Sequence, residues 1–161
     1  MANVQMTGMV ELAETLKEFP VKLEVQVMAS ALRGGAKVVQ AQAVQNAPVD
    51  SGDLRDSIRI RRRTNKRTGF LNLHVVAGNK KAWYAHIIEF GAKAHEIRVS
   101  KKKSMLLSGI LREVVQHPGV RPSGFMRRAF DQTASGAVEE VARLTKKGVE
   151  RLEWRRARGR I

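Results

Sequence analysis

The chain has 161 residues, no cysteine, and 30 Lys and Arg residues against 15 Asp and Glu, so its formal net charge is +15. The absence of cysteine excludes disulfides, thiol catalysis and Cys-ligated zinc or iron–sulfur sites. No apolar run approaches the length of a membrane span, and the first residues lack the pattern of a signal peptide. We therefore expect a single basic, soluble domain of residues 1–152, followed by a basic tail of residues 153–161.

Two helices are predicted in the first third of the chain. Residues 9–19 form a short amphipathic segment that Pro20 ends, and a longer segment extends from residue 21 to about residue 47. Apolar residues recur at helical spacing along one face of the longer segment, namely Val21, Val25, Met28, Leu32, Ala36, Val39 and Ala43. A neighbouring stripe is rich in small residues: Val27, Ala31, Gly34, Val38 and Ala41. Because small side chains leave the backbone accessible, we expect another element to pack closely against this stripe.

The spacing of apolar residues then changes to a period of two. Ile58 and Ile60 alternate with arginines, and residues 71–77 alternate in the same way, so a β-hairpin with a basic tip at residues 64–69 is predicted. Residues 83–90 return to helical spacing and end at Gly91, a residue that often terminates helices. Residues 95–99 and 105–117 contain further short β-like runs.

A long helix is predicted at the end of the chain, with Ser123 as its N-cap. Its expected apolar face consists of Met126, Phe130, Ala134, Ala137, Val141, Leu144, Gly148 and Leu152. The order of elements predicts an α+β fold, in which a mostly antiparallel sheet of about four strands packs against long N-terminal and C-terminal helices.

The residues that could carry catalysis are sparse. Each of the four histidines is isolated in sequence, none has metal-ligand spacing, and the glycines form no phosphate-binding loop. A hydrolase that used His86 and Glu89 would lack a nucleophile. We therefore expect no enzyme activity, no cofactor and no metal site. Glu89 lies between Ile88 and Phe90, and a carboxylate in such apolar surroundings requires an Arg or backbone partner, in the same chain or on another subunit.

The excess positive charge is concentrated in short clusters. The candidate basic docking or DNA-facing residues are Arg59, Arg61, Arg62, Arg63, Lys66, Arg67, Lys101, Lys102 and Lys103. Aromatic residues make up 5% of the chain and are not interleaved with these clusters, so the stacking platforms of single-strand binders are absent. The clusters could face a neighbouring subunit, a connector protein or DNA, or they could form a solvated face that keeps the protein soluble.

Three motifs follow one another along the chain. Residues 47–58 (APVDSGDLRDSI) come after the long helix, residues 83–91 (WYAHIIEFG) after the hairpin, and residues 117–130 (HPGVRPSGFMRRAF) open the last helix. In this order and spacing they resemble the tail-completion or head–tail joining (neck) proteins of long-tailed bacteriophages, over roughly residues 20–145. One departure is the insertion of Ser123-Gly124 between Pro122 and Phe125, where that family usually has Pro followed directly by Phe.

The resemblance implies a small α+β subunit that forms a homo-oligomeric ring, often a hexamer, at the head–tail junction. Such a ring completes the tail end, docks on head connector and tail tube proteins, and leaves a channel for DNA. The protein would then be located in the virion after assembly in the host cytoplasm, with no membrane partner.

We expect Trp83, Tyr84, Glu89 and Phe90 to form a structural or subunit-contact cluster in that setting. An alternative is that Trp83 and Phe90 are ordinary core residues. The rival function is a basic nucleic-acid-binding protein that acts in packaging or regulation.

Overall fold

The computed structural model describes residues 9–17, 19, 21–64, 71–98, 105–107 and 109–159. The elements in chain order are α1 (Met9–Lys17), α2 (Val21–Asn46), α3 (Asp53–Asp56), β1 (Arg59–Thr64), β2 (Leu71–Val76), α4 (Ala85–Phe90), β3 (His95–Arg98), β4 (Met105–Leu107), β5 (Ile110–Arg112), β6 (Val114–His117) and α5 (Phe125–Ala157). None of the described helices is both long and apolar enough to cross a lipid bilayer.

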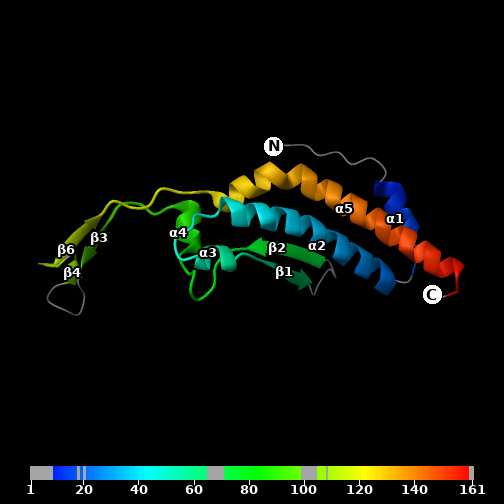
Figure 1. Cartoon of the computed structure of the whole chain (residues 1–161), viewed down its shortest axis with the longest axis horizontal. Helices are drawn as coiled ribbons and strands as arrows, with labels where there is room; N and C mark the ends of the chain where they lie inside the picture. Colours follow the sequence, from blue (N-terminus) through cyan, green and yellow to red (C-terminus); the bar gives the residue numbers. More distant parts are fainter. Residues whose placement is uncertain are drawn as a thin grey trace.

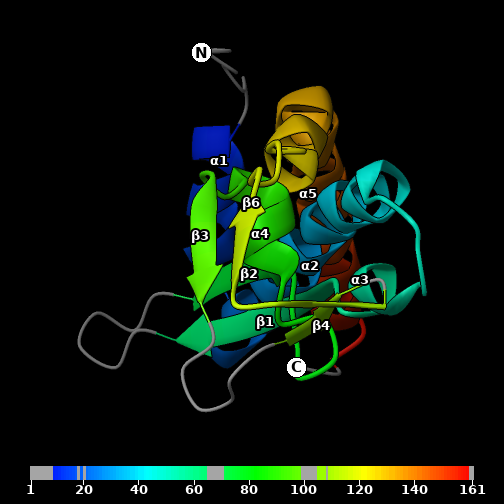
Figure 2. The ribbon, with the colours of Figure 1, turned by 90° about the vertical axis from the view of Figure 1, so that its left-hand side faces the viewer.

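Helices α2 and α5 run antiparallel along most of the molecule, and α2 lies between α5 and the β1–β2 hairpin (Figures 1 and 2). The two helices approach closely where glycines replace side chains. A Cβ atom on Gly35 would lie 2.7 Å from the carbonyl oxygen of Ala137, and one on Gly148 would lie 2.5 Å from a methyl group of Val27. Part of the predicted small-residue stripe of α2 thus lies against α5: Val27 faces Gly148 and Gly34 faces Leu144, whereas Val38 and Ala41 line an open hollow beside α5.

The main hydrophobic core lies where the end of α2 meets α3, α4 and the beginning of α5. Phe125 is its largest fully buried side chain, and the other buried members are Ala43, Ala47, Leu54, Ile58, Ala82, Ala85 and Ala129. Val75 of β2 packs against this cluster and so fixes one face of the hairpin on the helices. Outside this core, Leu16 of α1, Phe19, and Val149 and Leu152 of α5 are also buried, and α1 contacts α5.

The predicted α+β class, antiparallel pairing and long helices from both parts of the chain are confirmed. The described strands form three separate two-stranded sheets instead of joining into one: β1–β2, β3–β6 and β4–β5. The β1–β2 register places Arg59 opposite Val76 and Thr64 opposite Leu71. This hairpin can cover α2 because one of its faces is apolar. Strand β3 has all four side chains exposed, so it offers no apolar face with which to join that layer.

Two predicted apolar faces are shifted in the structure. Val21 of α2 is 72% exposed and Phe130 of α5 is 56% exposed, although both were expected on buried faces. The neighbouring residue Ala129 is fully buried instead of Phe130. A helix with apolar residues on adjacent stripes can bury either one, and the partner element decides which.

Both ends of α5 differ from the prediction. Its N-cap is Gly124, with φ 59°, and Ser123 lies outside the helix. At the other end the helix continues to Ala157, so the first residues of the predicted basic tail are helical. Burial of Val149 and Leu152 near α1 stabilises this last part of the helix.

Candidate interaction surfaces

The first sequence motif forms the corner between α2 and the β1–β2 hairpin. The buried hydroxyl of Ser57 donates a hydrogen bond to the carbonyl of Leu54 (2.6 Å) and accepts one from the backbone N–H of Gly78 (2.9 Å). Arg55 donates from Nε to the carbonyl of Ala47 at the end of α2 (3.3 Å). These contacts connect the motif to both neighbouring elements, so its polar residues have a structural role.

The basic residues of β1 have different environments. Arg59 is half-buried, and its Nη1 donates to the carbonyls of Ser57 (2.8 Å) and Gly78 (2.7 Å) at the base of the hairpin. Arg61, Arg62 and Arg63 are exposed. The remaining predicted basic residues, Lys66, Arg67, Lys101, Lys102 and Lys103, lie outside the described residues.

The exposed arginines of β1 lie on two different faces of the hairpin. Side chains alternate between faces along a strand, so Arg61 and Arg63 share the face that points away from α2. His74, which is paired with Arg61 in the register, lies on that same face. Arg62 lies on the other face with Ile60 and, in the opposite strand, Leu73. Only the outer face therefore presents two arginines directly to solvent.

The predicted aromatic cluster is divided between core and surface. Tyr84 packs against the hydrophobic core. Trp83 is 65% exposed and Phe90 is 79% exposed. The rings of Trp83 and Tyr84 meet edge to face with 6.1 Å between their centroids. Trp83 and Phe90 are thus not core residues of this chain, and both remain available for contact with another molecule.

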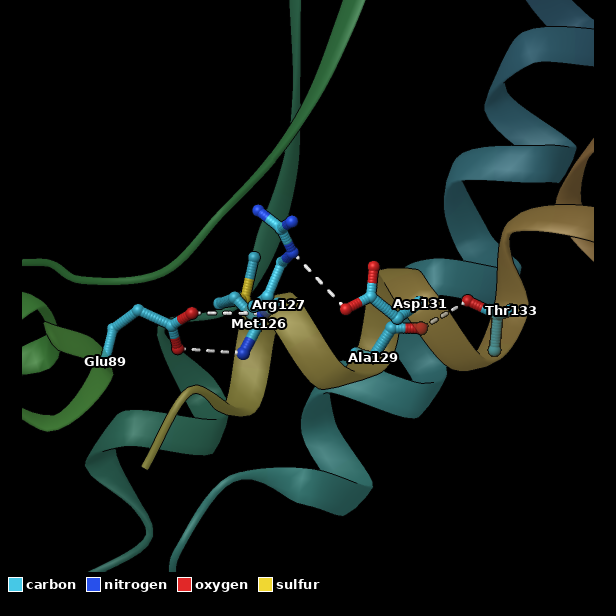
Figure 3. A network of polar contacts seen from close by, with 6 residues as sticks. All are labelled: Glu89, Met126, Arg127, Ala129, Asp131 and Thr133. Atoms are coloured by element: carbon cyan, nitrogen blue, oxygen red, sulfur yellow. Dashed lines mark hydrogen bonds and ion pairs between the residues drawn. The ribbon is translucent and has the colours of Figure 1, made fainter. Parts of the chain in front are cut away.

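Glu89 has the backbone partner that its apolar neighbours required, and it lies within the same chain (Figure 3). Its Oε2 accepts a hydrogen bond from the N–H of Met126 (2.9 Å), and its Oε1 accepts one from the N–H of Arg127 (3.0 Å). The first N–H groups of a helix have no partner inside the helix and carry partial positive charge. The carboxylate of α4 therefore caps α5, whose own N-cap residue makes no side-chain hydrogen bond.

Two chain segments leave the body together beside α4. The backbones of Ala92 and Val120 exchange both possible hydrogen bonds (each 2.9 Å), and Ser123 donates from its N–H to the carbonyl of Ile88 (2.8 Å). Glycines permit this approach. Gly91 has φ 76°, and a Cβ atom there would lie 2.6 Å from the carbonyl oxygen of Val120. Gly119 has φ 86°, and a Cβ atom there would lie 2.9 Å from the backbone nitrogen of Ala94.

We call the described residues of the range 92–120, namely 92–98, 105–107 and 109–120, the arm, which extends away from the helices in Figure 1. Its β3–β6 ladder places His95 opposite His117, and the two imidazole rings stack with centroids 5.0 Å apart. Glu96 accepts a hydrogen bond from the side-chain amide of Gln116 (2.7 Å). Ile97 and Ile110 are exposed. Outside residues 105–107, 111 and 112, none of the described arm residues has a buried apolar side chain.

The described residues include no group of three or more His, Asp or Glu side chains that could hold a metal ion. His86 contacts the carbonyl of Trp83 through Nδ1 (3.0 Å), and the hydroxyl of Ser51 donates a hydrogen bond to Oδ2 of Asp53 (2.8 Å). What the sequence motifs do bring together is a buried corner, a capped helix and the base of the arm. Their shared chemistry is backbone hydrogen bonding, which positions elements.

Comparison with known proteins gives one family. The sequence model of the HK97-gp10-like family, described as "Bacteriophage HK97-gp10, putative tail-component", matches residues 11–91, just over half of the chain. The match begins in α1 and ends at Gly91, where the arm begins. No curated protein and no solved structure matches significantly. The matched range contains the first two motifs, the α2 helix and the complete β1–β2 hairpin, and the chain belongs to the HK97-gp10-like family of bacteriophage tail components.

Proposed function

We propose that this protein is a structural virion component at the head–tail junction, where its copies form a ring that completes the tail end and joins it to the head connector. Membership of a phage tail-component family supports a virion location and contacts with other virion proteins. A structural family also favours a role without catalysis. The observation that carries the finer proposal is the arm, a two-stranded ribbon whose described side chains are exposed or only partly buried.

A two-stranded ribbon is at best marginally stable in water, and each of its outer edges presents unpaired backbone groups. Such an arm is stabilised when another protein covers it. Trp83 and Phe90 lie on the segment at the base of the arm and add exposed aromatic area there. Contact between the arm of one copy and the body of the next is heterologous, since it uses two different surfaces, and a heterologous contact can close into a ring.

The resemblance of the three motifs favours a ring of six copies with tail tube and connector proteins as neighbours. DNA would pass through the centre of this ring. The outer face of the hairpin, with Arg61 and Arg63, would provide salt-dependent contacts to DNA that do not depend on its sequence.

Excision of the arm tests the proposal. In this variant residues 95–117 are replaced by a short glycine linker, which preserves the Ala92–Val120 bridge and the body. Native mass spectrometry of the unmodified protein, alone and mixed with its tail tube and connector partners, should show a ring. The excised variant should remain monomeric with unchanged helical circular dichroism.

A matched control is Val21→Ala, which trims an exposed side chain of α2 in the body and should leave ring formation intact. Persistence of the ring without the arm would contradict the proposed contact. Heads still joined to tails in a phage that lacks the gene would contradict the proposed function as a whole.

The basic outer face of the hairpin favours one rival, a nucleic-acid-binding protein. That function predicts retardation of duplex DNA at low salt, lost in a variant with Arg61→Glu and Arg63→Glu. Absence of retardation for the unmodified protein would exclude the rival.

A further inference from the structure

Two open hollows flank the exposed side of α2. The first, of about 520 Å³, lies between α2 and α5 and is lined in part by Gly34, Val38, Ala41 and Leu144. The second, of about 320 Å³, lies between α2 and the hairpin and is lined in part by Ala29, Ile60 and Leu73. Ser30 and Arg33 line both hollows, so the two are adjacent across one helix. Small residues of α2 leave this space unfilled.

The rims of these hollows are cationic. Arg33, Lys37 and Arg62 line them and are exposed, and within the ranges that the structure describes none of the three has an ion pair or hydrogen bond. The one carboxylate, Glu140, is bound by Arg143 through Nε–Oε2 (2.7 Å) and Nη2–Oε1 (2.8 Å). This hydrogen bond lowers the pKa of Glu140. Glu140 is therefore paired with Arg143 and makes no ion pair with Arg33, Lys37 or Arg62.

We propose that this face docks an acidic amphipathic segment of another protein. Apolar side chains of the segment fill the two hollows, and its carboxylates bind Arg33, Arg62 and Lys37. Arginine forms paired hydrogen bonds with a carboxylate, and it is enriched among the residues that dominate binding energy at protein interfaces. Because the hollows share Ser30 and Arg33, a single segment that crosses α2 occupies both.

The apolar floors favour a peptide over DNA as the occupant. A phosphate backbone supplies charge but no apolar group for the hollows lined by Val38 and Leu144 or by Ile60 and Leu73. DNA would bind at least as well to the outer face of the hairpin, where Arg61 and Arg63 are equally exposed. The inference deepens the proposed function, on which it rests, by specifying the chemistry of a neighbouring virion protein.

The test uses the purified full chain and a fluorescein-labelled peptide of repeated Leu-Glu-Glu-Leu units, followed by fluorescence anisotropy at physiological salt. A peptide with Gln in place of every Glu tests the need for carboxylates. Arg33→Glu combined with Arg62→Glu should weaken binding of the acidic peptide by at least about tenfold, because two charge-assisted contacts are lost. Ala41→Trp, which fills the first hollow from an exposed position without changing charge, should also weaken binding.

The matched control is the pair Arg61→Glu and Arg63→Glu, which changes the net charge equally on the other face of the hairpin. Screening at this salt concentration limits its expected effect to less than about twofold. Equal weakening by both pairs, equal binding of the Gln peptide, or no binding of the acidic peptide overturns the proposal. It is also overturned if duplex DNA binds and depends on Arg33 and Arg62. A ring in native mass spectrometry alongside any of these results leaves the proposed function standing and rejects only this docking site.

Discussion

The body and the arm of this protein are stabilised in different ways. The body buries Phe125 and a layer of alanines in a core formed by its own helices and hairpin, although Val21, Phe130 and other large apolar side chains at its surface are exposed. The arm is held by backbone hydrogen bonds and by glycines at its base, while Ile97 and Ile110 are exposed. The body thus has a hydrophobic core of its own, and the described side chains of the arm form none.

The largest expected effect comes from the body core. Phe125→Ala should lower the free energy of unfolding by about 3–5 kcal/mol, because it removes a fully buried aromatic side chain and leaves a cavity. Ile97→Ala in the arm should change it by less than about 0.5 kcal/mol, since this side chain is exposed. Urea unfolding monitored by circular dichroism measures both. Similar losses for the two variants would show that the arm shares the core of the body.

A second prediction concerns the contact between the long helices. Gly35→Ala should destabilise the protein by about 1–3 kcal/mol, because its Cβ would overlap the carbonyl of Ala137. Gly136→Ala is the control on α5: nothing lies within 4 Å of its Cβ position, so it should stabilise the protein by about 0.5–1 kcal/mol through helix propensity. Thermal unfolding compares the two. Destabilisation of the same size by both would contradict the close packing of α2 on α5.

The cap that joins α4 to α5 lies between body and arm and should have an intermediate effect. Glu89→Ala should cost about 1–2 kcal/mol, because two N–H groups of the α5 N-terminus lose their acceptor and the helix dipole loses a favourable charge. Glu139→Ala, an exposed carboxylate farther along α5, should change stability by less than about 0.5 kcal/mol. Hydrogen exchange at Met126 and Arg127 should become faster only in the Glu89 variant. Unchanged exchange there would refute the cap.

At the base of the arm, Gly119→Ala should disturb the arm and spare the body. A Cβ atom at this φ of 86° is strained by roughly 1–2 kcal/mol, and it would also crowd the backbone of Ala94. NMR chemical shifts of residues 92–98 and 114–120 should change, while those of α2 and of the middle of α5 stay in place. Loss of the global fold would mean that the arm and the body are one cooperative unit.

The smallest effect is expected from pH. Hydrogen bonding to Arg143 lowers the pKa of Glu140 below its ordinary value. A carboxylate with a lowered folded-state pKa contributes stability that is present at neutral pH and is lost as the pH falls through that pKa. As the pH falls below 4.5, the ordinary pKa of the side chain, the unfolding temperature should therefore fall more steeply in the unmodified protein than in Glu140→Gln. The difference should be slight because the pair is exposed to solvent. Parallel pH profiles would indicate that the pair makes no contribution.

Local patterns in the sequence predicted the elements well, because each depends on neighbouring residues. The helical spacing of residues 21–47 predicted α2, and the alternation around residues 58–77 predicted the hairpin. The sequence also indicated that Glu89 needs a partner. It could not identify Met126 and Arg127 as the partners. Met126 is 37 residues from Glu89 along the chain, and the two come together only where the chain returns from the arm to the body.

The surface of α2 was less predictable for a similar reason. Arg33 and Lys37 resemble ordinary solvated side chains in the sequence, and only the packing of the hairpin places Arg62 and Leu73 beside them. The predicted faces of both long helices carried adjacent apolar stripes, so periodicity alone did not decide that Phe130 would be exposed and Ala129 buried. Which stripe of each helix is buried is determined by packing against distant elements, and periodicity does not encode that packing.

The bridge between Ala92 and Val120 has an evolutionary consequence. Since the chain leaves and re-enters the body at one point, the intervening segment can gain or lose paired residues without changing the distance between α4 and α5. The body can therefore be inherited almost unchanged while the arm varies in length and side chains to suit different neighbours. The family match ends at Gly91, immediately before this bridge, and covers neither the arm nor α5.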